Sequence, residues 1–125
     1  MAKRPHKKLD AWLKAIELTV ETYRQTEQLP RDEKFGLISQ MRRAAVSIAS
    51  NIAEGAARDT KKDFIRFLHN ARGSLSELDT QVVICIQLGY LSKEACELLN
   101  EQMERESKLL TGLIKYLKNE QVKIS

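Results

Sequence analysis

The 125-residue chain contains few of the residues that interrupt helices, build disulfide frameworks or make membrane spans. Only 2 prolines and 5 glycines occur, which leaves room for long uninterrupted elements. The 2 cysteines, Cys85 and Cys96, are too few for a disulfide framework, and no histidine lies at zinc-ligand spacing from them. The longest strongly apolar run, VVICI, is far too short to span a bilayer. We therefore expect no membrane-spanning segment and two reduced, at least partly buried thiols.

Motifs of catalysis are missing as well. The sequence has no glycine-rich phosphate loop, no G-x-S-x-G, no H-E-x-x-H and no E-x-x-H of the kind found in di-metal bundles. His6 and His69 are distant in sequence, and neither belongs to a well-formed constellation with a nucleophile or a carboxylate. The sequence therefore predicts a protein that is not an enzyme and that uses no cofactor and no metal.

The composition is that of an ordinary soluble protein. Hydrophobic residues make up 42% and charged residues 30% of a length that suits a single domain. The basic N-terminus, MAKRPHKKLD, is followed by no apolar signal core, so we expect a cytoplasmic location. We divide the chain into a basic flexible tail at residues 1–8, a four-helix domain at residues 9–118 and a frayed C-terminal tail at residues 119–125.

Apolar residues recur at intervals of three and four along four segments, which is the period of amphipathic helices. The first predicted core face consists of Leu9, Trp12, Leu13, Ile16, Val20 and Tyr23. The second consists of Ile38, Met41, Ala45, Ile48 and Ile52. The third consists of Phe64, Leu68, Ala71, Leu75, Leu78, Val82 and Cys85. The fourth consists of Leu99, Met103, Glu106, Leu110, Leu113 and Leu117.

Helix start and stop signals separate these segments. The second helix is expected to begin near Asp32 and to stop at Gly55. Thr60 caps the third helix and Gly89 ends it, while Ser92 caps the fourth. With short connections and no competing strand pattern, these segments predict an all-α, antiparallel up-down-up-down four-helix bundle.

The second helix also carries a row of small and polar residues that does not look like an ordinary core. The row consists of Arg43, Ser47, Ser50, Asn51 and Glu54. It is interpreted in three ways, as a solvated face, as a contact with another subunit, or as the site of an ion pair with Glu17 of the first helix. Folding the second and third helices together brings Ala44 level with Gly73, so we expect the two backbones to approach closely there.

Two strings in this region, QMRRAAVSIASNIAEG and FIRFLHNARGSLSELDTQVVICIQLGYLS, resemble the four-helix-bundle family of 23S rRNA-intervening-sequence proteins. The resemblance covers roughly residues 9–92. It implies a cytoplasmic homopentamer, a ring of bundles, and it favours the subunit contact for the polar row. A structurally related pentamer, the accessory protein of diversity-generating retroelements, binds nucleic acid and a reverse transcriptase.

Basic residues are expected to gather at the end of the bundle that holds the N-terminus, the turn between the second and third helices, and the C-terminus. The candidate nucleic-acid-binding residues are Lys3, Arg4, Lys7, Lys8, Arg58, Lys61, Lys62 and Arg66. Such a surface attracts an RNA or DNA backbone without reading its sequence. No aromatic residues interleave with these basic ones in the sequence, which favours a merely solubilising surface. The hypotheses are thus an accessory protein for a nucleic acid or a reverse transcriptase, or a scaffold for proteins alone.

Overall fold

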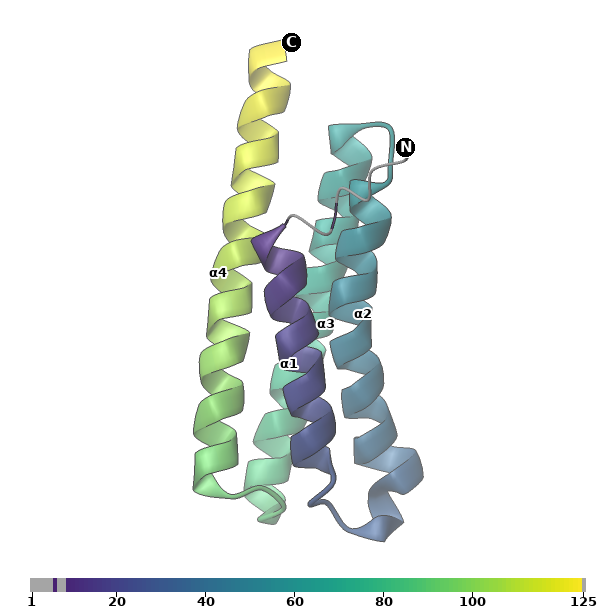
Figure 1. Cartoon of the computed structure of the whole chain (residues 1–125), viewed down its shortest axis with the longest axis vertical. Helices are drawn as coiled ribbons and strands as arrows, with labels where there is room; N and C mark the ends of the chain where they lie inside the picture. Colours follow the sequence, from purple (N-terminus) through teal and green to yellow (C-terminus); the bar gives the residue numbers. More distant parts are fainter. Residues whose placement is uncertain (1–5, 7–8, 125) are drawn as a thin grey trace.

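The structure, a computed structural model, describes residue 6 and residues 9–124. Over this part of the chain it contains four α-helices and no strand: α1 (Asp10–Thr26), α2 (Ser39–Ala56), α3 (Lys61–Leu88) and α4 (Lys93–Ile124) (Figure 1). Each helix packs against the next along the chain, and α1 also packs against α4. The start of α1, the α2–α3 turn and the end of α4 lie toward one end in Figure 1, whereas the other two connections lie at the opposite end.

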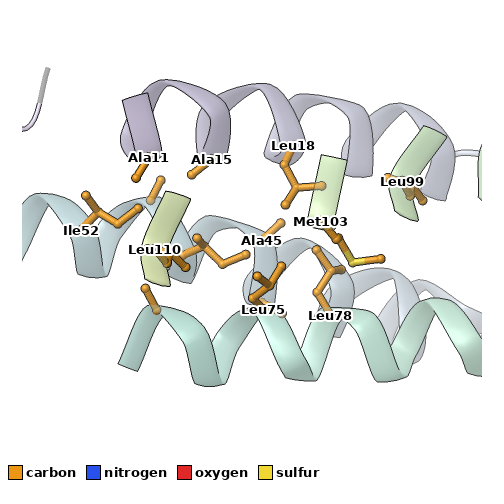
Figure 2. Packing of buried hydrophobic residues seen from close by; sticks show 14 of the residues in the cluster. Ala11, Ala15, Leu18, Ala45, Ile52, Leu75, Leu78, Leu99, Met103 and Leu110 are labelled. Atoms are coloured by element: carbon orange, nitrogen blue, oxygen red, sulfur yellow. The ribbon is translucent and has the colours of Figure 1, made fainter. Parts of the chain in front are cut away.

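One apolar core runs between the four helices, and three of the four predicted faces line it. From α2, Met41, Ala45, Ile48 and Ile52 are buried, with Ile38 partly buried beside them. From α3 and α4, every predicted core residue is buried except Phe64 and Leu113, which are half-buried. Figure 2 shows side chains from all four helices meeting in this core. No helix within residues 9–124 is both long and apolar enough to cross a membrane.

The predicted core face of α1 is wrong for four of its six residues, whereas Leu9 and Trp12 are partly buried against the core. Leu13, Ile16, Val20 and Tyr23 are 39–44% exposed. The face that α1 buries consists of Ala11, Ala15, Leu18, Thr22 and Thr26. The structural reason is the close approach of α1 to α2, because small side chains occupy the contact and leave the larger ones outside.

Hydrogen bonds within and between helices make this small-residue face of α1 stable. Thr22 Oγ1 donates to the Leu18 carbonyl at 2.8 Å, so its hydroxyl is satisfied although the residue is fully buried. Thr19 Oγ1 lies 2.7 Å from the Ala15 carbonyl oxygen of its own helix and 3.1 Å from the Ala45 carbonyl oxygen of α2. A side chain as short as threonine can reach the backbone of a neighbouring helix only where the two helices are close.

The helix ends agree with the sequence in three places and differ in three. Thr60 Oγ1 accepts from the Asp63 amide and Ser92 Oγ from the Ala95 amide, while Gly89 ends α3 in the left-handed conformation with φ of 71°. However, α2 begins at Ser39, because a 3₁₀ turn (Arg31–Glu33) and a π-helical turn (Lys34–Ile38) precede it. At the other ends, α2 includes Gly55 and stops at Ala56, and α4 continues to Ile124, beyond the domain boundary predicted at residue 118.

The close approach of α2 and α3 occurs at Gly55, not at Gly73 as predicted. A Cβ added to Gly55 would lie 2.8 Å from Phe67 Cβ and 2.9 Å from Phe64 Cδ1, whereas one added to Gly73 would meet nothing within 4 Å. Gly73 faces solvent because it lies between Ala71 and Leu75, on the side of α3 away from its buried face. The two helices also pair with a different register. Ser47 lies opposite Ser74, so residues level with each other have numbers that sum to about 121, rather than the 117 of the predicted pair Ala44 and Gly73.

These two glycines give a matched pair of substitutions. Gly55→Ala is expected to destabilise the protein by about 1–3 kcal/mol, because the added methyl group overlaps Phe67. Gly73→Ala is expected to stabilise it by up to about 1 kcal/mol, because alanine is the better helix former and the site is open. Urea unfolding monitored by circular dichroism measures both. Equal effects of the two substitutions would show that α3 does not approach α2 at Gly55.

Candidate functional site

The basic end of the bundle contains the predicted nucleic-acid-binding residues that the structure describes. Arg58 follows the end of α2, and Lys61, Lys62 and Arg66 lie in the first turns of α3. The end of α4 lies at the same end of the molecule (Figure 1). The other predicted residues, Lys3, Arg4, Lys7 and Lys8, lie outside the described residues.

An aromatic ring organises two of these cations. The guanidinium carbon of Arg58 lies 4.7 Å from the centroid of the Phe67 ring, and that of Arg66 lies 4.6 Å from it. Guanidinium groups at this distance are attracted to the ring and keep their N–H donors available. The contact depends on Gly55, because the missing side chain there lets Phe67 sit against α2 only three residues before Arg58.

The remaining charges at this end differ in how freely they can meet a ligand. Lys61 Nζ pairs with Glu120 at 3.5 Å, and the lysine is half-buried, so it tethers α3 to α4. Lys62 is exposed and forms no ion pair with another described residue. Arg58 pairs with Glu54 at 3.7 Å and Arg66 with Asp63 at 3.6 Å, but these exposed pairs contribute little stability.

The aromatic contribution to this surface does not follow from the sequence pattern. The pattern places Phe64 in the core and makes no prediction for Phe67. It also predicts a basic cluster without aromatic residues. In the structure Phe67 is 7% exposed and lies under two arginines. The sequence does indicate part of this contact, since Phe67 directly follows Arg66. Arg58 comes close to the Phe67 ring only when α2 and α3 fold together.

The polar row of α2 separates into an inward and an outward part. The Ser47 and Ser74 hydroxyls form a hydrogen bond of 2.8 Å between α2 and α3. Asn51 Nδ2 donates to the Ser47 carbonyl at 2.8 Å and to Ser47 Oγ at 3.0 Å. Ser47 and Asn51 therefore use their polar groups within the chain.

The predicted ion pair between this row and Glu17 does not form. Glu17 pairs with Lys14 at 3.0 Å and with Arg105 of α4 at 3.5 Å, and the hydrogen bond from Lys14 lowers the pKa of its carboxyl. Arg42 instead donates to Thr26 Oγ1 at 3.0 Å. The reason is again the register of the helices, which places Arg42 level with the last turn of α1.

The outward part of the row borders an apolar surface. Arg43, Ser50 and Glu54 are exposed, and so is Val46 on the same side of α2. Val46 joins the exposed residues of α1 in a shallow groove of about 660 Å³. The groove is lined by Thr19, Val20, Tyr23, Arg24, Glu27 and Val46. We call the surface formed by Leu13, Ile16, Val20, Tyr23 and Val46 the α1 apolar face.

Comparison with known proteins identifies the family. Residues 7–112 match the family described as 23S rRNA-intervening sequence protein. The chain belongs to this family. The matched residues include the α2–α3 turn, Phe67 of α3 and both parts of the polar row of α2. The match to the 23S rRNA-intervening sequence protein family ends within α4.

A solved structure also resembles the chain. It is a protein of unknown function from the S23 ribosomal protein family of Bacteroides thetaiotaomicron VPI-5482. The two chains are 25% identical and align with a TM-score of 0.77 over 84% of this chain and 95% of that one. No curated protein matches the chain. The comparisons thus establish the family and the fold, and they assign no activity.

The inward part of the polar row can be tested by a double-mutant cycle. Ser47→Ala and Ser74→Ala are each expected to destabilise the protein by about 1 kcal/mol, since each leaves the other hydroxyl without its partner. The double variant is expected to be more stable than the sum of the two effects predicts. Urea unfolding of the four proteins gives the coupling energy, and additive effects would mean that the two serines do not interact.

Proposed function

We propose that the chain is a cytoplasmic, non-enzymatic accessory protein that binds the phosphate backbone of a nucleic acid with its basic end. The observation that carries the proposal is the pair of Arg58 and Arg66 over the Phe67 ring, with the exposed Lys62 one turn before Arg66 on α3. Two of these three cations lie in α3 and one in the α2–α3 turn, at one end of the molecule, and the ring beneath the two arginines limits their motion. A rigid group of cations loses less conformational entropy on binding phosphate than three independent side chains would lose.

The distribution of charge along the bundle supports the proposal that a nucleic acid binds at the basic end. The stretch from Gly73 to Glu106 forms the opposite end of α3 and α4, and it holds six exposed acidic residues against Lys93 and Arg105. The molecule is therefore polarised, with the cationic cluster at the end away from these acids. A nucleic acid approaching the bundle is attracted to the basic end and repelled by the other.

Replacement of Arg58, Lys62 and Arg66 by Gln tests the basic end. The triple variant is expected to bind single-stranded RNA more weakly whatever its sequence, because these side chains meet phosphate and not bases. The slope of log K against log salt is expected to flatten by up to about 0.7 for each phosphate that the variant no longer neutralises. Fluorescence titration of one labelled RNA at several salt concentrations measures both effects.

A control variant removes the same charge from the opposite end of the bundle. Arg31, Lys34 and Lys93 are exposed, and their replacement by Gln lowers the net charge equally. This variant is expected to keep the salt slope of the wild type. Equal weakening by both variants would mean that net charge alone governs binding. Absence of wild-type binding at low salt would favour the scaffold for proteins alone.

We further propose that the chain is an antiparallel up-down-up-down bundle that assembles into a homo-oligomeric ring, a pentamer by family resemblance, through the α1 apolar face. Four large side chains of α1 are exposed beside Val46, which is a contiguous apolar surface of the kind that marks protein contacts. Arg43, Ser50 and Glu54 form its polar border on α2, as is usual at the rim of an interface. An assembly of this kind would bring several basic ends together for a nucleic acid or a reverse transcriptase.

A charge introduced on the apolar face tests the assembly. Val20→Glu is expected to dissociate the oligomer without loss of helicity, because a carboxylate would be buried in an apolar contact while Val20 is exposed in the single chain. Lys108→Glu, on the exposed side of α4, is the control and is expected to leave assembly unchanged. Light scattering gives the mass of each protein. A wild type of 14.3 kDa would contradict the assembly, and an oligomeric Val20→Glu variant would place the contact elsewhere.

A further inference from the structure

A carboxyl group lies in the middle of the apolar core. Glu106 occupies a core position of α4 between Met103 and Leu110 and is 0% exposed. Figure 2 shows both of these neighbours pointing into the core, Met103 near Leu18 and Leu78 and Leu110 nearer Ile52 and Ala15. An isolated carboxylate in such surroundings loses its hydration and costs far more free energy than the neutral acid.

No described residue donates a hydrogen bond to this group. Both Glu106 oxygens are buried and accept none, and the same holds for Oε1 of Gln102. Gln102 precedes Glu106 by four residues on α4, so the two side chains are neighbours on the helix surface. The pair thus has three buried acceptor oxygens and no donor directed at them. A proton on Glu106 would supply a donor.

We propose that Glu106 is a proton-binding site in the core, which holds one proton when the chain is folded and donates it to Gln102 Oε1. Protonation removes the buried charge and satisfies two of the unbonded oxygens with one hydrogen bond. The bundle thereby becomes a pH-sensitive structure, since folding takes up a proton at any pH where the unfolded chain has released it.

The groups that face Glu106 do not offer another way of stabilising a carboxylate. The buried faces of α1, α2 and α3 present apolar side chains and three polar ones, Thr22, Thr26 and Gln81. The two threonine hydroxyls donate to carbonyls of α1, and Gln81 lines a groove with Arg43 of α2 on the other side of α3. The nearest charges from α1 and α4, Glu17 and Arg105, pair with each other at the surface. On α3 the charged residues that line the groove toward α4, Arg72 and Asp79, are exposed.

The pKa of Glu106 is consistent with this geometry. Burial raises it from the ordinary value of 4.5 to about 8, against a smaller lowering by Arg105. Below pH 4.5 the folded and unfolded chains are both protonated at this residue, and its contribution to stability is complete. As pH rises from 4.5 toward 8, only the folded chain keeps the proton, so stability falls. The folding equilibrium constant decreases about tenfold for each pH unit in this window.

Urea unfolding of wild type and Glu106→Gln at fixed protein concentration between pH 5 and pH 8 tests the proposal. Glutamine keeps the shape and removes the titration. The ratio of the wild-type folding constant to that of the variant is expected to fall about 100-fold between pH 5 and pH 7. Glu104→Gln is the matched control, because Glu104 is exposed and pairs with Lys108, and its ratio is expected to change little. A ratio for Glu106→Gln that does not depend on pH overturns the proton site.

Carbon-13 NMR of glutamate carboxyls in the folded protein tests the same group directly. One resonance is expected to titrate above pH 7 and to be missing in Glu106→Gln. In Gln102→Met the acceptor of the proton is removed, so the pKa of Glu106 is expected to fall while staying above the ordinary range. Titration of every glutamate near pH 4.5 overturns the proposal. An unchanged pKa in Gln102→Met overturns the role of Gln102 as the proton acceptor.

Discussion

Close packing of α2 against its neighbours is the constraint on which the rest of the structure depends. On one side, Ala11 and Ala15 of α1 let Thr19 reach the Ala45 carbonyl. On the other side, Gly55 leaves no room for a side chain against Phe67. Because dispersion and hydrophobic burial both increase as the helices approach, small residues at these contacts stabilise the fold as effectively as larger ones would at a wider spacing.

The same constraint produces the two surfaces on which the proposals rest. When α1 turns its alanines, Leu18 and two of its threonines inward, Leu13, Ile16, Val20 and Tyr23 remain outside and, with Val46 of α2, form the α1 apolar face. When Phe67 settles against Gly55, its ring comes under Arg58 and Arg66. The candidate interfaces are therefore consequences of backbone spacing. They occupy different parts of the bundle, so the two proposed contacts do not exclude each other.

The core itself combines tight packing with one ionisable group that such packing would usually exclude. Glu106 follows the apolar period of α4, and at that position a hydrophobic residue would fill the same space without a desolvation cost. As a neutral acid it is compatible with the surrounding side chains. The protonation state of this residue thus belongs to the description of the fold, in the same way as the packing of Met103 and Leu110 beside it.

The sequence by itself determined the four helices, the caps at Thr60 and Ser92, the stop at Gly89 and the core faces of α2, α3 and α4, because period and capping act within a few residues of the chain. It also determined the family, through strings that lie within α2 and α3. Only the tertiary structure decided which face of α1 is buried, that Gly55 rather than Gly73 marks the close approach, and that Phe67 lies under an arginine of α3 and an arginine of the α2–α3 turn. Each of these depends on the register and spacing of helices that are distant in sequence. A periodic pattern identifies a hydrophobic stripe, but the distance between backbones decides whether that stripe or a row of small residues is buried.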